Sequence, residues 1–400
     1  MRFLAVHSLV GGLNCGFVLF PQGGPDKASD VTGMQNSNAT VRSMRIAQIA
    51  PLDEAVPPKL YGGTERIVSY LTEELVELGH DVTLFASGDS VTNANLQPMC
   101  RQGLRLDRSV ADRLAPYHLM LERVAQAADS FDILHFHIDH MTFPLFRRIN
   151  ARFLTTLHGR LDLPELVPLF KEFSEVPLVS ISVAQREPLA FANWVATIHH
   201  GLPPLRMSPV ARSQGYLAFL GRISPEKRPD LAVRLARRAN CRIKIAAKVD
   251  AADQFYFDEV VVPLLAEPHV EFVGEINEDE KQDFLANARA LLFPINWPEP
   301  FGLVMIEAMR CGTPVIAFRH GSVAEVVDDG ITGFIIDTEA EALDAINRVD
   351  QLDRQRIREV FLQRFSSRGM AEEYLSLYRS LGSARNDARS EPTARTAEFR

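Results

Sequence analysis

The segment of this sequence best suited to chemistry runs from Trp297 to Glu307 and contains two glutamates, one in a proline-rich turn and one in an expected helix. Glu299 lies between two prolines, which fix their own φ and restrict the residue before each, so its carboxylate is held on a stiff loop. A helix expected from Gly302 to Cys311 would turn free N–H groups and a positive dipole end toward an anion. Glu307 could accept a pair of hydroxyls, as the acidic residue of dinucleotide folds does. Both glutamates could instead be solvated residues at a helix end, but the whole segment favours a ligand with hydroxyls and phosphates.

A cationic turn lies earlier in the chain, between Gly221 and Pro229, after an expected strand and before an expected helix. Arg222 and Lys227 could converge there on one diphosphate, the arginine as a planar fork and the lysine as a point charge. The sequence contains no Asp-x-Asp motif that could hold a divalent metal between phosphates. A diphosphate leaving group would then depend on protein cations to absorb its charge, so we expect no metal. Taken alone, this turn is equally consistent with a solvated cationic surface.

A pair of glycines, Gly62 and Gly63, precedes an amphipathic helix. Adjacent glycines allow a backbone to approach a ligand closely. By itself the pair predicts only an ordinary turn, and its interest depends on the two segments above.

A histidine-rich stretch offers a different chemistry. His135, His137, Asp139 and His140 follow a His-x-His-x-Asp-His spacing that resembles the metal-binding signature of metallo-β-lactamase-like hydrolases. Imidazoles and a carboxylate at this spacing can bind zinc and generate hydroxide. The flanking chain has a parallel α/β rhythm rather than the antiparallel-rich layers that those hydrolases need. Zinc-dependent hydrolysis is therefore kept as an alternative.

The elements that position these residues alternate between short apolar strands and helices, which is typical of parallel sheets covered on both faces. An aperiodic linker from Gly201 to Gln214 separates two such series. The sequence therefore predicts an α/β protein of two Rossmann-like doubly wound domains facing across a cleft, with ligands at the carboxyl ends of the strands. The expected strands are 45–50, 81–86, 132–136, 153–157, 178–183 and 195–198 in the first series, and 216–220, 242–247, 270–273, 290–294, 315–318 and 334–336 in the second.

The division of the chain follows from these series. We expect a poorly structured N-terminal extension, a first domain, a second domain, C-terminal helices that pack back on the first domain, and a disordered polar tail. Their expected ranges are 1–43, 44–205, 206–355, 356–382 and 383–400.

Composition excludes some classes of function. The chain has 400 residues, more than one hydrophobic core usually supports, and its net charge of −8 argues against a nucleic-acid partner. Its 4 cysteines are far apart, which fits a reducing compartment better than a disulfide scaffold. The broken apolar stretch of residues 3–20 could be a poor signal peptide, but it fits a non-conforming extension better. Elsewhere no apolar run is long enough to span a bilayer, so we expect a cytoplasmic protein. A weak association with the inner face of the membrane is left open by Arg147, Arg148 and Arg152, which could meet anionic lipid.

Taken in order, the motifs resemble those of the family 4 glycosyltransferases of GT-B architecture, over roughly 44–381. The matching features are the Gly62-Gly63 loop, His158 after a strand of the first domain, the Gly-Arg and Glu-Lys pairs of 221–227, and the paired glutamates Glu299 and Glu307. One departure is His320-Gly321-Ser322, where the family usually has two glycines, and it leaves the geometry of a loop near the donor open.

The resemblance implies retaining transfer of a hexose from a nucleotide-sugar, with no metal or other cofactor. It implies that the first domain binds the acceptor and the second the donor, with Glu307 on the ribose, Glu299 on sugar hydroxyls and His158 beside the transferred sugar. The catalytic residues that it implies are His158, Glu299, Arg222 and Lys227. The donor-binding residues are Gly62, Gly63, Arg222, Lys227, Ile276, Glu299, Phe301, Gly302, Leu303 and Glu307.

The expected donor is of the UDP-glucose or GDP-mannose type, and the expected acceptor is a glycan, a lipid-linked saccharide or a small molecule. The sequence does not predict the oligomeric state. A catalytically silent nucleotide-sugar-binding protein of the same fold is a further alternative. The presence of Glu299, Glu307, Arg222 and Lys227 together argues against it.

Overall fold

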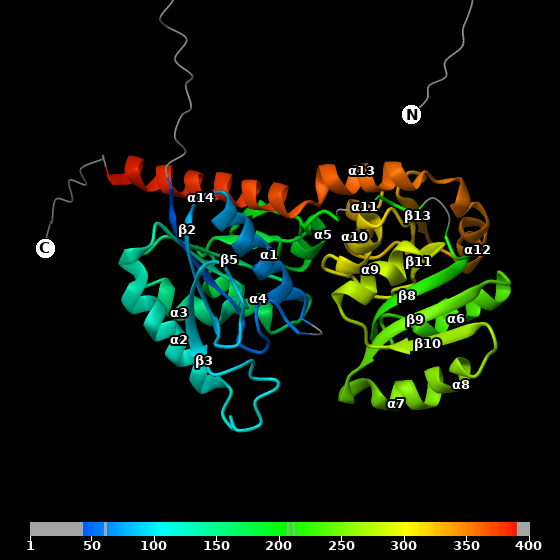
Figure 1. Cartoon of the computed structure of the whole chain (residues 1–400). Helices are drawn as coiled ribbons and strands as arrows, with labels where there is room; N and C mark the ends of the chain where they lie inside the picture. Colours follow the sequence, from blue (N-terminus) through cyan, green and yellow to red (C-terminus); the bar gives the residue numbers. More distant parts are fainter. Residues whose placement is uncertain (1–42, 60–61, 206–207, 211–212, 390–400) are drawn as a thin grey trace, which may run out of the picture. The chain divides into compact units, whose positions relative to one another are not determined.

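The structure, a computed structural model, describes residues 43–59, 62–205, 208–210 and 213–389, with 382–389 described by backbone alone (Figure 1). The expected N-terminal extension lies outside the described residues except for Ser43, and so does the expected tail beyond Arg389.

The first sheet has seven strands in the order β3-β2-β1-β4-β5-β6-β7, and each neighbouring pair is parallel. The strand order reverses between β1 and β4, and in open α/β sheets ligands bind beside such a switch point. The strands are β1 Arg45–Ile49, β2 Asp81–Ser87, β3 Asn95–Cys100, β4 Ile133–Phe136, β5 Phe153–Thr156, β6 Leu178–Ser180 and β7 Trp194–Thr197. The helices of this half are α1 Gly63–Glu77, α2 Leu114–Ala127, α3 Phe143–Phe146, α4 Leu166–Glu172 and α5 Val183–Arg186, with short 3-10 turns η1 Ala128–Ser130, η2 Asp139–Thr142 and η3 Glu187–Leu189.

The second sheet has six parallel strands in the order β10-β9-β8-β11-β12-β13, with its own reversal between β8 and β11. Its strands are β8 Tyr216–Ile223, β9 Arg242–Val249, β10 Val270–Gly274, β11 Ala290–Phe293, β12 Val315–Phe318 and β13 Gly333–Ile336. The helices are α6 Pro229–Arg238, α7 Gln254–Tyr256, α8 Val262–Leu265, α9 Glu278–Ala286, α10 Leu303–Arg310, α11 Val323–Val326, α12 Glu339–Arg348, α13 Arg354–Arg364 and α14 Ser367–Arg389, with the π-helical turn η5 Phe257–Val261 and the 3-10 turns η4 Ala251–Asp253 and η6 Val349–Gln351. Two doubly wound sheets confirm the predicted fold class.

Local sequence accounts for the elements that position the site. In α1 the apolar residues Ile67, Leu71 and Leu75 recur at helical spacing and are all buried, so one face of the helix packs on the first sheet. The chain leaves this helix through Gly79, whose φ of +86° is costly for any residue with a Cβ. β2 then begins at Asp81, paired with β1.

The structure differs from the prediction at several places. β6 ends at Ser180 and α5 begins at Val183, whereas a strand was expected over 178–183, because the Ser182 hydroxyl accepts from the Gln185 N–H and starts the helix. β3 was not predicted because its sequence is polar, contains Pro98 and lies at a sheet edge where only Met99 is buried. β8 continues to Ile223, so Arg222 belongs to a strand end rather than to the following turn. α14 continues to Arg389, which corrects the expected start of the disordered tail at Ser383, because residues 383–389 contain no glycine or proline to end a helix.

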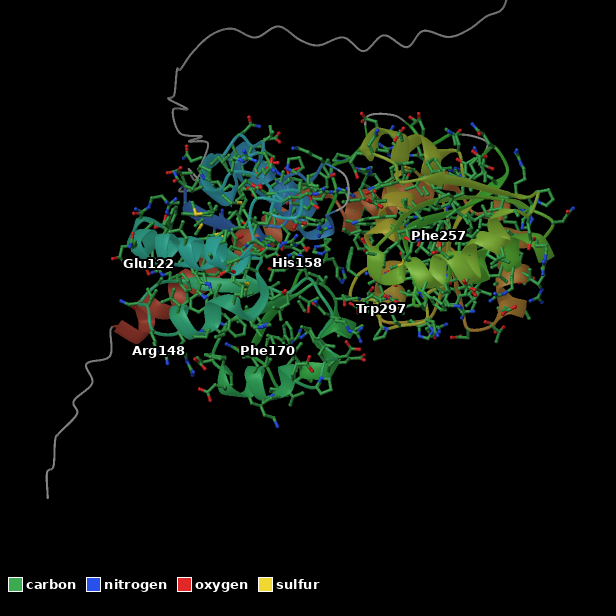
Figure 2. The ribbon with its side chains drawn as sticks, turned by 90° about the horizontal axis from the view of Figure 1, so that it is seen from below. Glu122, Arg148, His158, Phe170, Phe257 and Trp297 are labelled. Atoms are coloured by element: carbon green, nitrogen blue, oxygen red, sulfur yellow. The ribbon has the colours of Figure 1, made fainter. Side chains whose placement is uncertain are left out.

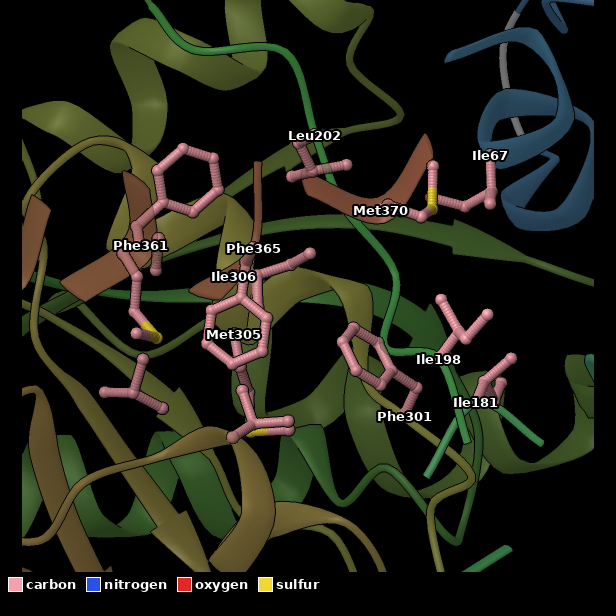
Figure 3. Close-up of a cluster of buried hydrophobic side chains, with 14 of the residues drawn as sticks. Ile67, Ile181, Ile198, Leu202, Phe301, Met305, Ile306, Phe361, Phe365 and Met370 are labelled. Carbon is pink, nitrogen blue, oxygen red and sulfur yellow. The ribbon is translucent and has the colours of Figure 1, made fainter. Parts of the chain in front are cut away.

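The largest hydrophobic cluster joins both halves of the described chain, and Figure 3 shows part of it. Leu202 of the linker, Phe301 of the proline-rich turn and Met370 of α14 are among its buried members. α13 packs on α10, and α14 packs on α1. The loop that carries Glu299 is therefore anchored by Phe301 in a well-packed core.

Candidate functional site

A cavity of about 750 Å³ is lined by residues from both halves of the described chain. His158 and Trp297, labelled in Figure 2, contribute from the first and second halves of the chain, respectively. Every residue that the sequence singled out for catalysis or donor binding lines this one cavity: Gly62, Gly63, His158, Arg222, Lys227, Ile276, Glu299, Phe301, Gly302, Leu303 and Glu307. The structure thus brings these residues together, and the individual roles remain predictions.

Glu299 and Lys227 face each other in the cavity. The Lys227 ammonium forms an ion pair with Oε2 of Glu299, and the Trp297 indole N–H donates to the same oxygen at 2.8 Å. Lys227 Nζ also lies 4.9 Å from the centroid of the Trp297 ring, a cation–π distance. The lysine is therefore oriented by a carboxylate and an aromatic face, and a bound phosphate would compete with Glu299 for it.

The loop that carries Glu299 is fixed by hydrogen bonds from Ser322. Its backbone N–H donates to the Glu299 carbonyl at 3.0 Å, and its hydroxyl donates to the Phe301 carbonyl at 2.8 Å. Gly321 packs so closely against this loop that a Cβ would overlap the backbone N and O of Glu299. The His320-Gly321-Ser322 departure thus retains its glycine at the position where the loops touch.

α10 begins beside these residues. Gly302 precedes it with a φ of +77°, and no side chain caps the helix. The first N–H groups of an α-helix lack intrahelical partners, and Leu303 and Val304 of this first turn both line the cavity. An uncapped helix start at a cavity wall favours an anionic ligand group.

Glu307 is almost fully buried, at 3% exposure, within a cluster of opposite charges. Its Oε1 accepts from Lys281 Nζ at 2.8 Å and from Arg66 Nη1 at 3.3 Å. Burial by itself would raise the pKa of Glu307, but the charges of Lys281, Arg66 and Arg310 outweigh that effect and hold the pKa below its usual value. Glu307 is thus an ionised acceptor suited to hydroxyl groups.

Arg66 and Lys281 were missed by the sequence analysis. Arg66 directly follows the Gly-Gly-Thr-Glu motif, so its position near the expected ligand was a usable signal. Lys281 lies in α9, whose sequence gives no indication that this one lysine is buried, with its side chain 8% exposed.

Arg222 is partly occupied by acidic neighbours. Its Nη2 is 2.7 Å from Glu226 Oε1, and its other guanidinium nitrogens are 3.8 Å from Asp250 and 3.7 Å from Asp253. A phosphate that binds Arg222 must therefore displace Glu226 or share the guanidinium with it. This makes Lys227 the stronger candidate of the two cations.

The zinc hypothesis is not supported by the positions of its four residues. His135 is buried with its ring nitrogens 2.7 Å from the Tyr378 and Thr156 hydroxyls, and His137 is buried against His158 and Gln48. Asp139 and His140 are exposed after the strand. The imidazole nitrogens are thus engaged in hydrogen bonds with protein groups. No cluster of three or more His, Cys, Asp or Glu residues suited to a metal ion occurs in the described part of the chain.

Glu65, in the first turn of α1, also lines the cavity and was not predicted. Burial raises the pKa of its carboxyl to about 7, against partial compensation by its own backbone N–H and by Arg105. The folded protein then keeps this proton up to about pH 7, whereas the unfolded chain releases it near 4.5. The free energy of unfolding therefore falls as the pH rises from about 4.5 to about 7, and Glu65 is least favourable to folding above pH 7.

Glu65→Gln is therefore expected to stabilise the protein more at pH 8 than at pH 5, by up to about 3 kcal/mol of unfolding free energy. Urea unfolding of wild type and variant at both pH values measures the difference. Glu77→Gln, an exposed position on the same helix, is the matched control for the loss of a carboxylate from α1. Equal effects of Glu65→Gln at both pH values would contradict the assigned proton.

Two family models match successive parts of the chain. The model described as "Glycosyltransferase Family 4" matches residues 61–178, and the model described as "Glycosyl transferases group 1" matches residues 208–361. D-inositol 3-phosphate glycosyltransferase 2 of Catenulispora acidiphila is 32% identical over 148 residues, which cover 34% of this chain and 33% of that protein. The segments matched in the first curated relatives span 33% to 41% of those proteins' lengths.

Two solved structures of the same fold are matched over their entire length. Sucrose-phosphate synthase from Thermosynechococcus elongatus has a TM-score of 0.69 at 20% identity, covering 85% of this chain and 100% of that one. Anabaena HepE in complex with UDP and glucose has a TM-score of 0.62 at 19% identity, covering 84% and 100%. The two sheets and their order thus define a GT-B fold. Together with the family matches, this shows that the chain belongs to the family 4 glycosyltransferases.

Within the ranges that the structure covers, none of the helices combines the length and apolar character needed to cross a bilayer. Arg147 pairs with Glu172 and Glu175 at 2.8 Å each, so its charge is largely neutralised and gives little support to a lipid contact.

Proposed function

We propose that this protein is a retaining glycosyltransferase that moves a hexose from a nucleoside-diphosphate sugar to an acceptor hydroxyl without a metal ion. The observation that carries the proposal is the convergence of Lys227, Glu299, Glu307 and the start of α10 on one cavity. Cations and helix N–H groups suit a diphosphate, and the two carboxylates suit the hydroxyls of a sugar and a ribose.

The chemistry assigned to these residues is mainly electrostatic. Lys227 and the first N–H groups of α10 hold the diphosphate as the bond between its oxygen and the anomeric carbon breaks, because charge then accumulates on the leaving oxygen. Arg222 adds a second cation when Glu226 yields to phosphate. The acceptor hydroxyl forms the new C–O bond on the face that the leaving group occupied, and its proton passes to the departing phosphate oxygen. Glu299 and His158 position the hexose, and Glu307 binds the ribose.

The donor proposed is a UDP-hexose, with a GDP-hexose as the alternative. The structural neighbour HepE was solved with UDP and glucose, which supports UDP. The acceptor is proposed to bind on the cavity wall made by the first domain, where Asp53, Arg105, Leu114 and Tyr117 lie. This mixture of charged, apolar and hydrogen-bonding groups suits a small polar acceptor or the end of a glycan, such as the sugar end of a lipid-linked saccharide. The proposed location of the reaction is the cytoplasm or the inner face of the cytoplasmic membrane.

A thermal-shift experiment with UDP, GDP and ADP in the presence of a chelator tests the proposal. UDP at one hundred times its Kd is expected to stabilise the protein by about 2.7 kcal/mol, which raises Tm by a few degrees. Uridine is the control, because it lacks the diphosphate that Lys227 and α10 are proposed to bind. Absence of a shift with all three diphosphates would overturn the proposed donor site, and a shift only after metal is restored would overturn metal independence.

A further inference from the structure

A chain of buried hydrogen bonds leads from the cavity to the C-terminal helix. His158, which lines the cavity, has its Nε2 2.9 Å from Nδ1 of His137. His137 Nε2 lies 2.8 Å from Oε1 of Gln48, and Gln48 Nε2 donates to the Tyr378 hydroxyl at 3.2 Å. These four groups come from the loops after β5 and β4, from β1 and from α14, so the hydrogen bonds link three adjacent strands of the first sheet to the C-terminal helix.

Both histidines are neutral in this setting. Burial lowers the pKa of His158 to about 3 and that of His137 well below its ordinary value. A neutral imidazole carries one proton, so one ring nitrogen donates and the other accepts.

The direction of the chain follows from the amide of Gln48. An amide oxygen only accepts, so His137 Nε2 must carry the proton and His137 Nδ1 must accept. His158 Nε2 then donates to His137, which leaves the Nδ1 of His158 without a proton. Tyr378 fixes the amide at its other end, because its oxygen accepts from Gln48 while its hydroxyl can donate to His135 Nδ1 at 2.7 Å.

The bare Nδ1 of His158 has no hydrogen-bond partner within the described part of the chain. Among the residues that the structure describes, no donor reaches it, although the atom is shielded from solvent. The ring itself is held flat against His200, with centroids 5.3 Å apart and planes inclined by 13°. A buried acceptor without a donor is unfavourable. A ligand hydroxyl can supply the missing hydrogen bond when ligand binding shifts the groups that cover Nδ1.

We propose that His137, Gln48 and Tyr378 are positioning residues that hold His158 as its Nε2–H tautomer, so that Nδ1 accepts a hydrogen bond from a hydroxyl of the transferred hexose. This inference rests on the proposed function. It adds that the C-terminal helix α14 supports the sugar end of the site through Tyr378, and that this position recognises a hydrogen-bond donor rather than a carbonyl or an anion.

Histidine ¹⁵N NMR of the full chain tests the tautomer directly. Two-bond correlations in wild type are expected to identify a protonated Nε2 and a bare Nδ1 on His158. A protonated Nδ1 would overturn the proposal, because it would mean that the Gln48 amide is reversed and the chain runs the other way. This readout needs no substrate, so it stands even if the proposed donor is wrong.

Gln48→Leu tests the functional consequence. Loss of the amide oxygen should mix the two His158 tautomers and lower kcat about 10-fold or more, because catalytic geometry is sensitive to small displacements. The Kd for free UDP should stay within about 2-fold of wild type, since the nucleotide is proposed to bind at Glu307 and α10. An unaltered tautomer with unaltered kcat would overturn the inference. If wild type also failed to bind UDP, the proposed function itself would be wrong.

A tyrosine pair on α14 provides a matched control should Gln48→Leu fail to fold. Tyr378→Phe removes the hydroxyl that bonds Gln48 directly. Tyr374→Phe removes a neighbouring buried hydroxyl that bonds Thr156 at 2.9 Å and whose hydrogen-bonded connection to Tyr378 runs through Thr156 and His135. We expect the first variant to alter the His158 tautomer ratio and kcat, and the second to leave both close to wild type. Equal tautomer ratios and equal kcat in the two variants would contradict a specific positioning role of Tyr378.

Discussion

Lys227→Ala is expected to lower kcat by about 10²–10³-fold, the usual effect of deleting one charge-stabilising donor from an active site. Lys227 is the cation that the cavity presents most directly, because its ammonium is held by a single carboxylate and an indole face. When the glycosidic bond breaks, negative charge grows on the leaving oxygen, and the variant has no ammonium to absorb it. The loss should therefore be larger in kcat than in the Kd for UDP, since the transition state carries more charge at that oxygen than the bound donor does.

Lys244→Ala provides the control for Lys227→Ala. Lys244 lies in β9 of the same sheet, pairs with Glu271 at 3.1 Å and does not line the cavity. Its loss should leave kcat within about 2-fold of wild type, because Lys244 lies outside the cavity. The variant should also fold normally, because a partly exposed ion pair contributes little to the free energy of unfolding. Steady-state kinetics of both variants, with Tm as a check on folding, measures the contrast. Unchanged turnover of Lys227→Ala would remove the cationic account of leaving-group stabilisation.

The fold could be predicted from sequence because its signal is local. Parallel strands are buried on both faces, so they read as short apolar runs, and helices between them carry a 3.6-residue apolar repeat. β3 was not predicted because an edge strand needs neither an apolar run nor a complete set of backbone N–H donors. Pro98, which has no backbone N–H, is tolerated there for this reason. The boundary of α14 was also missed, because polarity alone does not distinguish a solvated helix from a disordered tail.

The site was predicted where backbone restriction and residue type coincide. Glu299 between prolines and Gly302 before a helix can be recognised from sequence, and the structure brings both to the cavity with Lys227. Arg66 and Lys281 could not be assigned in the same way, because their importance depends on contacts with Glu307 across long sequence separations. A histidine spacing that matches a metal signature is equally ambiguous, since His135 and His137 instead fill buried hydrogen-bonding roles.

The second large effect is expected at a residue that contains no functional group. Gly321→Ala should lower kcat about 10²-fold, the loss that a displacement of roughly 1 Å at a catalytic group can cause. A Cβ on Gly321 would overlap the backbone N and O of Glu299, so the carboxylate loop must move, and the Ser322 hydrogen bonds that fix it must lengthen. Lys227 then loses its oriented partner without any change in the charges of the site.

The effect of displacement can be separated from that of backbone strain. Gly321 has a φ of +54° and Gly330 a φ of +74°, so alanine is strained at both positions. A Cβ on Gly330 meets no atom within 4 Å, however, and it lies outside the cavity lining. Gly330→Ala should therefore lose some stability but keep its kcat, whereas Gly321→Ala should lose both. If the two variants retained the same kcat, Glu299 would not depend on the Gly321 contact for its position. The arrangement of Glu299 against Lys227 would then have to be set by the prolines and Phe301 alone.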